Sequence, residues 1–253
     1  MKNLKLAAVC LSCLTMTGCS ALNFSVEGLI NAPKLTSEQS EIHQALIESV
    51  GSNITLKYPK NGEYRSAYVI ANIDDEPADE AMVFYEYTSN GSEEDGLRVN
   101  ILDKDEDGKW YSVKELAGAG TDIDQVIISP MGSNNQTDVF VGYQNLTNDE
   151  KTMEIYSYTD GDFKRVALDT YSVLEPLDIN NDGYIELITI QRSTNNDTGA
   201  VTAKASMLNM KNDEITRGEN VDMCDNVTSY VSSKTGMLDS GRRAIFIDGL
   251  TAD

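Results

Sequence analysis

From residue 52 to residue 253, short runs of apolar and β-branched residues alternate with clusters of Gly, Asn and Asp. This alternation is typical of strands joined by tight turns. No second long segment with helical spacing interrupts it, so a parallel sheet with crossover helices is not expected. We therefore predict an all-β domain of antiparallel strands over residues 52–253. The expected strands are Ile54–Tyr58, Ser66–Ile73, Ala81–Thr88, Leu97–Asp103, Lys109–Glu115, Gln125–Ser129, Asp138–Gln144, Thr152–Tyr158, Phe163–Asp169, Val173–Leu177, Ile185–Arg192, Val201–Met210, Ile215–Asp222, Val227–Ser232 and Arg243–Asp248.

One helix is predicted ahead of the strands, over residues 36–51. Thr36-Ser37-Glu38-Gln39 provides a capping box at its start, and Gly51 provides a C-terminal stop. His43 lies inside this helix, and we expect it on the solvated helix surface and not in the role of a catalytic base. The apolar residues at helical spacing are Ile42, Ala45, Leu46, Ile47 and Val50.

Two elements of the sequence recur at a fixed spacing. The turn Asp107-Gly108 returns 53 residues later as Asp160-Gly161, and an aromatic-led strand follows each. The segment 72–81 returns at 178–187, an offset of 106 residues and therefore twice 53. A period near 53 residues with four strands in each unit indicates four-stranded antiparallel blades, which are stable only when stacked on neighbours.

The segment 178–186 reads Asp-x-Asn-x-Asp-Gly-x-x-Glu and is flanked by predicted strands. It resembles the acidic loop of FG-GAP/VCBS-type repeats, which build β-propellers such as the integrin α-subunit head. The resemblance implies a β-propeller-like array of four-stranded antiparallel blades, preceded by the short N-terminal helix. About three and a half blades fit between residues 60 and 253. Two alternatives stay open: the chain is truncated, or its blades form an arc instead of a closed ring.

The same loop is the best candidate metal site in the sequence. Alternate side chains of a tight loop point inward, Gly183 permits the sharp turn, and a backbone carbonyl can face the same centre. Such an oxygen-only cage suits Ca²⁺, and in the resembling family this loop binds calcium between two strands. The alternative is a hairpin whose Asp and Asn side chains cap their own backbone. The predicted ligands are Asp178, Asn180, Asp182, the Tyr184 carbonyl and Glu186.

Related segments match this pattern less well. In the first repeat Pro77 replaces the loop Gly, and the longer Glu76 replaces Asp; the remaining polar positions there are Asn72, Asp74 and Glu80. The second repeat carries Ser133-Asn134-Asn135-Gln136 in its place. The run 103–108 imitates the first six positions of the motif, but Tyr111 occupies the ninth, so we interpret it as a solvated turn.

The N-terminus resembles the export signal of bacterial lipoproteins. Lys2 and Lys5 precede a short apolar stretch that ends in Met16-Thr17-Gly18-Cys19, similar to a lipobox, although Met16 departs from the usual Leu. We therefore predict a signal peptide over residues 1–18, then a lipidated Cys19 and a tether over residues 19–35. Fatty acids such as palmitate on Cys19 would anchor the chain to the extracytoplasmic face of a cell membrane.

Composition limits the chemistry that remains. With 20 Lys and Arg against 41 Asp and Glu, the formal charge is −21, which argues against nucleic acid as a partner. Cys10 and Cys13 lie in the signal peptide and Cys19 carries lipid, so Cys224 has no partner for a disulfide. The chain has one His, which leaves no basis for zinc or thiol catalysis.

Two classes of function follow. The favoured one is a non-catalytic cell-surface lipoprotein whose propeller-like domain binds an extracellular protein or glycan, with a structural Ca²⁺ loop. The alternative is a carbohydrate-active hydrolase that uses carboxylates on the propeller. The acidic residues concentrate in predicted turns, where a solvated role is usual, and this favours the first class.

Overall fold

The computed structural model describes a mainly β protein with one helix in its described residues. By internal contacts the chain divides into two units, Met1–Glu38 and Gln39–Asp253, and nearly all described residues belong to the second. The predicted signal peptide, Cys19 and Cys224 lie outside the described residues. These are 35–88, 96–131, 136–145, 150–178, 183–199, 201–211, 214–218, 221–222, 227–237 and 243–251.

Helix α3 spans Ser37–Val50, within one residue of the predicted bounds. It ends at Gly51, which adopts a φ of 84° and donates its N–H to the Ile47 carbonyl at 2.9 Å. A left-handed residue at this position terminates a helix, and Gly adopts it without steric cost. The predicted apolar stripe is used, because Ile42, Ala45 and Leu46 are buried against the first sheet.

The sequence predicted His43 on the solvated surface of the helix, and this prediction is wrong. Its ring is half-buried, and Nδ1 lies 2.8 Å from the hydroxyl of Tyr68, a buried residue of the first sheet. The two rings meet edge to face with their centroids 6.2 Å apart. Burial raises the pKa of Tyr68 to about 12, so its hydroxyl stays protonated near neutral pH. His43 therefore fastens the helix to the sheet.

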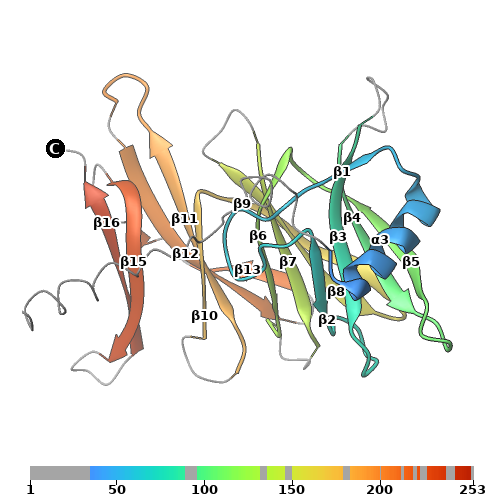
Figure 1. Ribbon diagram of the computed structural model, residues 1–253. Coiled ribbons are helices and arrows are strands. Elements are labelled where there is room, and N and C mark those ends of the chain that lie inside the picture. The colour runs from blue at the N-terminus through green and yellow to red at the C-terminus, as the bar shows by residue number, and fades with distance from the viewer. Residues whose placement is uncertain are drawn as a thin grey trace, which may run out of the picture. The chain divides into compact units, whose positions relative to one another are not determined.

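The strands form three consecutive antiparallel sheets, followed by a two-stranded one (Figure 1). Every predicted strand has an observed counterpart, and 138–144 and 173–177 match in both bounds. The predicted strand 215–222 is observed as two strands, β13 and β14. The strands are β1 Ile54–Leu56, β2 Tyr68–Ala71, β3 Glu80–Tyr87, β4 Leu97–Lys104, β5 Trp110–Ala117, β6 Asp122–Ser129, β7 Asp138–Gln144, β8 Lys151–Thr159, β9 Asp162–Tyr171, β10 Val173–Leu177, β11 Glu186–Thr194, β12 Val201–Lys211, β13 Glu214–Arg217, β14 Val221–Asp222, β15 Val227–Met237 and β16 Arg243–Thr251.

Each of the three sheets is a four-position meander, and we name them sheets A, B and C. In sheet A, β1 and β2 both pair with the same strand, β3, at opposite ends, and β4 and β5 follow. Sheet B has the order β6-β7-β8-β9. In sheet C, β10, β11 and β12 are followed by β13 and β14, which both pair with β12. Strands β15 and β16 pair with each other.

The recurring sequence elements fall at equivalent places in these sheets. Segments 72–79 and 178–185 each connect the first strand of a sheet to the second, as β2–β3 and β10–β11. The turns at Gly108 and Gly161 each connect the third strand to the fourth. Because the strands are antiparallel, both kinds of connection lie at the same end of their sheets.

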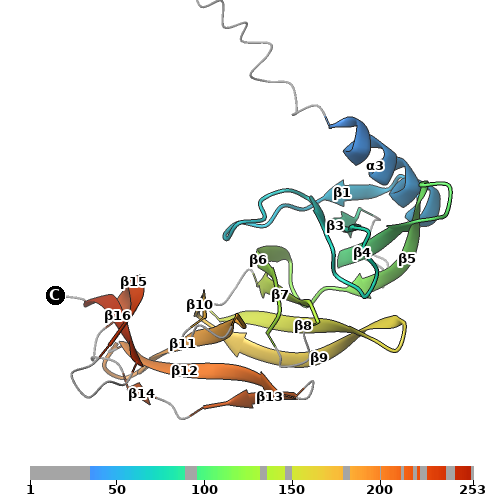
Figure 2. The same cartoon turned by 90° about the horizontal axis from the view of Figure 1, so that it is seen from below.

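Sheet A buries both of its faces. Alternate residues of a strand point to opposite faces of its sheet, so the side chains of β3 fall into two sets. Met82 and Phe84 belong to the apolar cluster shared with sheet B, whereas Ala81, Val83 and Tyr85 belong to the cluster that contains the buried residues of α3. Figure 2 shows α3 on the side of sheet A away from sheet B. Helix α3 therefore covers a sheet face that would otherwise be exposed.

Sheets B and C are joined in the same manner. Phe140, Ile155 and Tyr171 of sheet B share an apolar cluster with Leu187 and Leu208 of sheet C. Ion pairs add to these contacts, with Lys114 of sheet A bonded to Asp162 of sheet B, and Arg217 of sheet C bonded to Asp169 of sheet B. Consecutive sheets therefore pack face to face through continuous cores.

Candidate functional site

An acidic residue begins the second strand of each meander, next to the connection from the first. In sheet A, Glu80 accepts a hydrogen bond from the backbone N–H of Ile73 at 2.8 Å. In sheet B, Asp138 accepts one from the N–H of Met131 at 3.0 Å and another from the Ser157 hydroxyl. In both sheets the carboxylate accepts a hydrogen bond from the backbone N–H of the residue seven positions earlier, and this bond joins the two ends of the loop between the first and second strands. Glu80 was expected from its place in the acidic segment 72–80, but Asp138 was not predicted, although an acidic residue recurs at this strand position.

Glu80 is a buried carboxyl group whose pKa is raised. Its side chain is 1% exposed, and Oε1 has no hydrogen-bond partner among the described residues. Burial raises the pKa of Glu80 to about 7, although the hydrogen bond from Ile73 opposes this shift. The negative charges of Asp74 and Asp103 raise the pKa further.

This burial makes the stability of the protein depend on pH. The folded-state pKa of Glu80 lies above the unfolded value, so folding favours the protonated form, and this stabilisation is lost as pH rises through about 7. Between pH 4.5 and pH 8 the free energy of unfolding of the parent protein should fall by roughly 2 to 3 kcal/mol because of Glu80, and in Glu80→Gln this fall should be absent. Urea unfolding at several pH values measures it. Glu76→Gln, on the exposed part of the same connection, is the control, and equal pH profiles for the two variants would contradict the prediction.

The rest of the first connection is held by its own side chains. The Asn72 amide donates to the carbonyls of Glu76 and Ala78, the latter at 2.8 Å. Asp74 accepts from the N–H of Glu76 at 2.7 Å. These side chains cap the loop backbone, which is the alternative to metal binding that turn chemistry offers.

The predicted calcium loop is only partly described. Asp178 accepts a hydrogen bond from the N–H of Gly183 at 3.0 Å, and Gly183 has a φ of 91°, as a sharp turn requires. Tyr184 and Glu186 are also described, but Asn180 and Asp182 lie outside the described residues. Within the described part of the chain, no three His, Cys, Asp or Glu residues form a group that could hold a metal ion. The calcium site stays a prediction.

Residues 103–108, which match the first six positions of the acidic motif, form a turn, as predicted. Asp105 Oδ1 accepts from the N–H groups of Asp107 and Lys109, at 3.0 and 2.8 Å. Gly108 has a φ of 76° and donates its N–H to the Asp105 carbonyl at 2.8 Å. The side chain thus stabilises the hairpin between β4 and β5.

Two further carboxylates are buried within sheet B. Asp124 accepts from the Asn61 amide at 2.8 Å, from Lys151 Nζ at 2.7 Å and from the Tyr171 hydroxyl at 2.7 Å. Glu154 is paired with Arg165 and accepts from the Tyr156 hydroxyl at 2.7 Å. Both side chains are 2% exposed, so these hydrogen bonds offset the cost of burying the charge.

A groove lies between α3 and the β4–β5 hairpin, and we call it the helix–hairpin groove. It contains a hollow of about 340 Å³ and an adjoining one of about 300 Å³, and Ala45, Glu48, Lys109 and Trp110 line both. The residues that line the first hollow are Glu41, Gln44, Ala45 and Glu48 from the helix, with Asp107, Gly108, Lys109 and Trp110 from the hairpin. The helical residues are spaced three, four and seven positions apart and therefore share one face.

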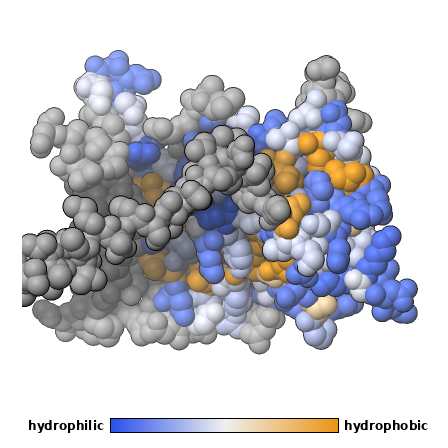
Figure 3. All heavy atoms as spheres, in the orientation of Figure 1, coloured by the Kyte–Doolittle hydropathy of each residue, from blue (hydrophilic) through white to orange (hydrophobic). Residues whose placement is uncertain are grey.

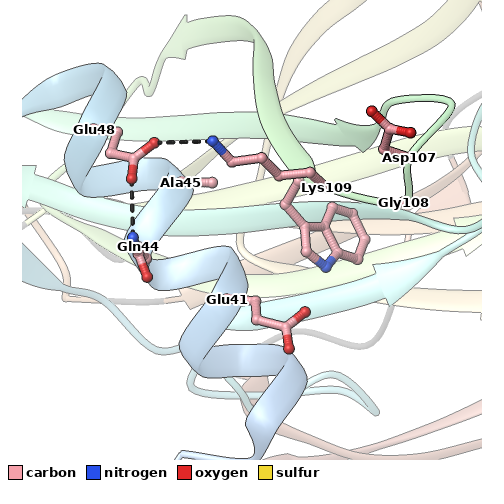
Figure 4. Close-up of a pocket in the computed structure, with 8 residues that line it drawn as sticks. Glu41, Gln44, Ala45, Glu48, Asp107, Gly108 and Lys109 are labelled. Carbon is pink, nitrogen blue, oxygen red and sulfur yellow. Dashed lines mark hydrogen bonds and ion pairs between the residues drawn. The ribbon is translucent and has the colours of Figure 1, made fainter.

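The polar contacts within the groove are few (Figure 4). Gln44 donates to Glu48 at 3.0 Å, and Glu48 lies 3.7 Å from Lys109 Nζ. Trp110 is 3% exposed, its ring receives Lys104 Nζ at 4.3 Å from the centroid, and its indole Nε1 has no hydrogen-bond partner among the described residues. The groove was not predicted from sequence, because its two walls lie about sixty residues apart in the chain.

Hydrophilic residues dominate the described part of the face shown in Figure 3, with apolar residues gathered where α3 passes into β1. Among the described residues, no helix is both long enough and apolar enough to cross a membrane. No protein-family model matches the chain, and no curated protein or solved structure shows a significant match.

Proposed function

We propose that the protein is a lipid-anchored, non-catalytic binding protein on the extracytoplasmic face of a cell membrane. Its scaffold would be a β-propeller-like array, and its partner an extracellular protein or glycan. One observation carries the non-catalytic part of this proposal. All four buried carboxylates among the described residues, Glu80, Asp124, Asp138 and Glu154, hold structural hydrogen-bond donors. The hydrogen bonds that these four side chains accept stabilise the fold.

The scaffold is supported by the repetition of its sheets. Sheets A, B and C share the order of a meander, and neighbouring sheets share apolar clusters, as propeller blades do. Connections of the same kind then recur at one end of successive sheets, so the scaffold presents several loops at that end. Binding residues are commonly presented on such loops by a rigid scaffold.

The anchor is supported by the sequence alone. The apolar stretch that ends at Gly18-Cys19 resembles a lipoprotein signal, and lipid on Cys19 would hold the chain at the membrane surface. The loop 178–186 would bind Ca²⁺ in a structural role, tying β10 to β11, in keeping with its resemblance to the acidic loops of propeller repeats.

Replacement of Cys19 tests the proposed location. In cells that make the full-length protein, we expect the parent chain in the membrane fraction and labelled by radioactive palmitate. Cys19→Ala should lose the label and be released, or should retain its signal peptide, because no thiol remains for the lipid. Cys13→Ala, in the predicted signal peptide, is the matched control and should behave as the parent. Unchanged membrane association and labelling of Cys19→Ala would refute the anchor.

A further inference from the structure

We propose that the helix–hairpin groove binds a basic segment of a partner protein, with a Lys or Arg side chain among its carboxylates and a peptide carbonyl at the Trp110 indole N–H. The inference rests on the proposed binding function and names the partner chemistry that one site would recognise. All groove residues belong to the described part of the chain and to its second unit.

The charge of the groove favours a cation. Its two hollows are lined by Glu41, Glu48, Asp105 and Asp107, against one ammonium group, that of Lys109. Lys104 is not among the lining residues, but its ammonium lies over the Trp110 ring, so four carboxylates face two cations near the groove. Glu41 and Asp107 have no ion pair with any described residue. A cationic side chain that enters the groove would therefore meet carboxylates not already neutralised.

A second observation points to a ligand independently of this charge. Trp110 is almost fully buried, it lines both hollows, and its indole N–H lacks an acceptor among the described residues. A buried donor without an acceptor carries an unfavourable desolvation cost. A peptide carbonyl that approached Nε1 from the groove would remove this cost, whereas an isolated ammonium ion offers no such acceptor. The groove therefore favours a basic peptide over an isolated cation.

In the absence of a partner, the side chain of Lys109 lies in the groove next to Glu48. Its ammonium lies 3.7 Å from Glu48, longer than a good charge-assisted hydrogen bond, and both side chains are mostly exposed. Such an exposed pair is weak, so a Lys or Arg from a partner can displace it. Removal of the Lys109 charge should strengthen the binding of a basic peptide, which a purely structural role for Lys109 would not do.

The test uses the single tryptophan of the chain, Trp110, as its reporter. Full-length protein is titrated with the capped peptide Ala-Lys-Ala-Arg-Ala, and Trp fluorescence is followed together with calorimetry. We expect saturable binding that weakens with salt, and much weaker binding of the capped peptide Ala-Gln-Ala-Gln-Ala. Glu41→Gln and Asp107→Asn should each weaken binding roughly two- to fivefold, and Lys109→Gln should strengthen it by a similar factor.

Asp197→Asn, in the exposed β11–β12 turn, makes the same charge change outside the groove and should leave the affinity unchanged. Equal weakening by Asp197→Asn, equal binding of the neutral peptide, or tighter binding of spermidine than of the basic peptide would each overturn the proposal. So would the absence of any fluorescence or calorimetric response. The labelling and fractionation of Cys19→Ala do not depend on the groove, so the anchor and the groove can fail separately.

Discussion

Replacing Gly142 with Ala is expected to destabilise the protein by about 3 to 5 kcal/mol, because strand β7 passes a buried side chain too closely for a methyl group. A Cβ at this position would lie 2.0 Å from the Tyr171 hydroxyl oxygen and 3.2 Å from the Phe140 ring. Tyr171 is fully buried and cannot turn into solvent. Its hydroxyl also donates to Asp124 at 2.7 Å, so the clash would break a hydrogen bond to a buried carboxylate.

A double-variant cycle isolates this contact. Tyr171→Phe removes the clashing oxygen but leaves Asp124 without one donor, at a cost of about 1 to 3 kcal/mol. In the Tyr171→Phe background, Gly142→Ala should cost clearly less than it does in the parent, because the closest atom is gone. Urea unfolding of the parent, both single variants and the double variant measures the coupling. Additive effects would show that the hydroxyl of Tyr171 is not what excludes a side chain at position 142.

Local features of the fold could be read from the sequence because they depend on local chemistry. The apolar and β-branched run between turn residues located β7, and the capping box and Gly51 located both ends of α3. The turn residues at Gly108 and Gly161 located two hairpins, since only a few residue types adopt a positive φ without strain.

Features that depend on long-range pairing could not be read in this way. Strands β1 and β2 share one edge of β3, and nothing in the short run Ile54–Leu56 distinguishes this place from a separate sheet position. The contact of His43 with Tyr68 joins residues 25 positions apart, and helical spacing alone left His43 on the surface. The burial of Glu80 follows from packing, whereas the sequence placed Glu80 only in a poorly matching copy of the acidic motif.

The candidate sites also differ in whether they depend on residues that are neighbours in the sequence or on long-range packing. The acidic connections were visible because their residues are neighbours in the sequence, but their observed role in sheets A and B is to bond the loop backbone. The helix–hairpin groove has no sequence signature, because each of its walls is an ordinary amphipathic element. Its unusual property is the indole N–H of Trp110, which has no hydrogen-bond acceptor among the described residues. The groove that Trp110 lines is formed by residues from both walls.

Replacing Leu46 with Asp is expected to have the largest effect of all, a loss of about 4 to 5 kcal/mol with self-association of the variant. Leu46 is fully buried between α3 and the outer face of sheet A, in the cluster that includes Val83 and Tyr85. An aspartate there would lose the apolar contacts and place a charge inside an apolar cluster.

The consequence for sheet A follows from what α3 covers. If the helix detaches, the face that carries Ala81, Val83 and Tyr85 becomes an exposed apolar surface, which favours pairing with a second copy. Ser49→Asp adds the same charge to an exposed position in the last turn of the helix, so it should cost no more than about 1 kcal/mol and leave the oligomeric mass unchanged. Urea unfolding and light scattering compare the two variants, and equal behaviour would contradict the role of the helix as a cover. Because α3 occupies this face, another sheet could pack there only after the helix is displaced, so the stack of sheets extends from sheet A in one direction.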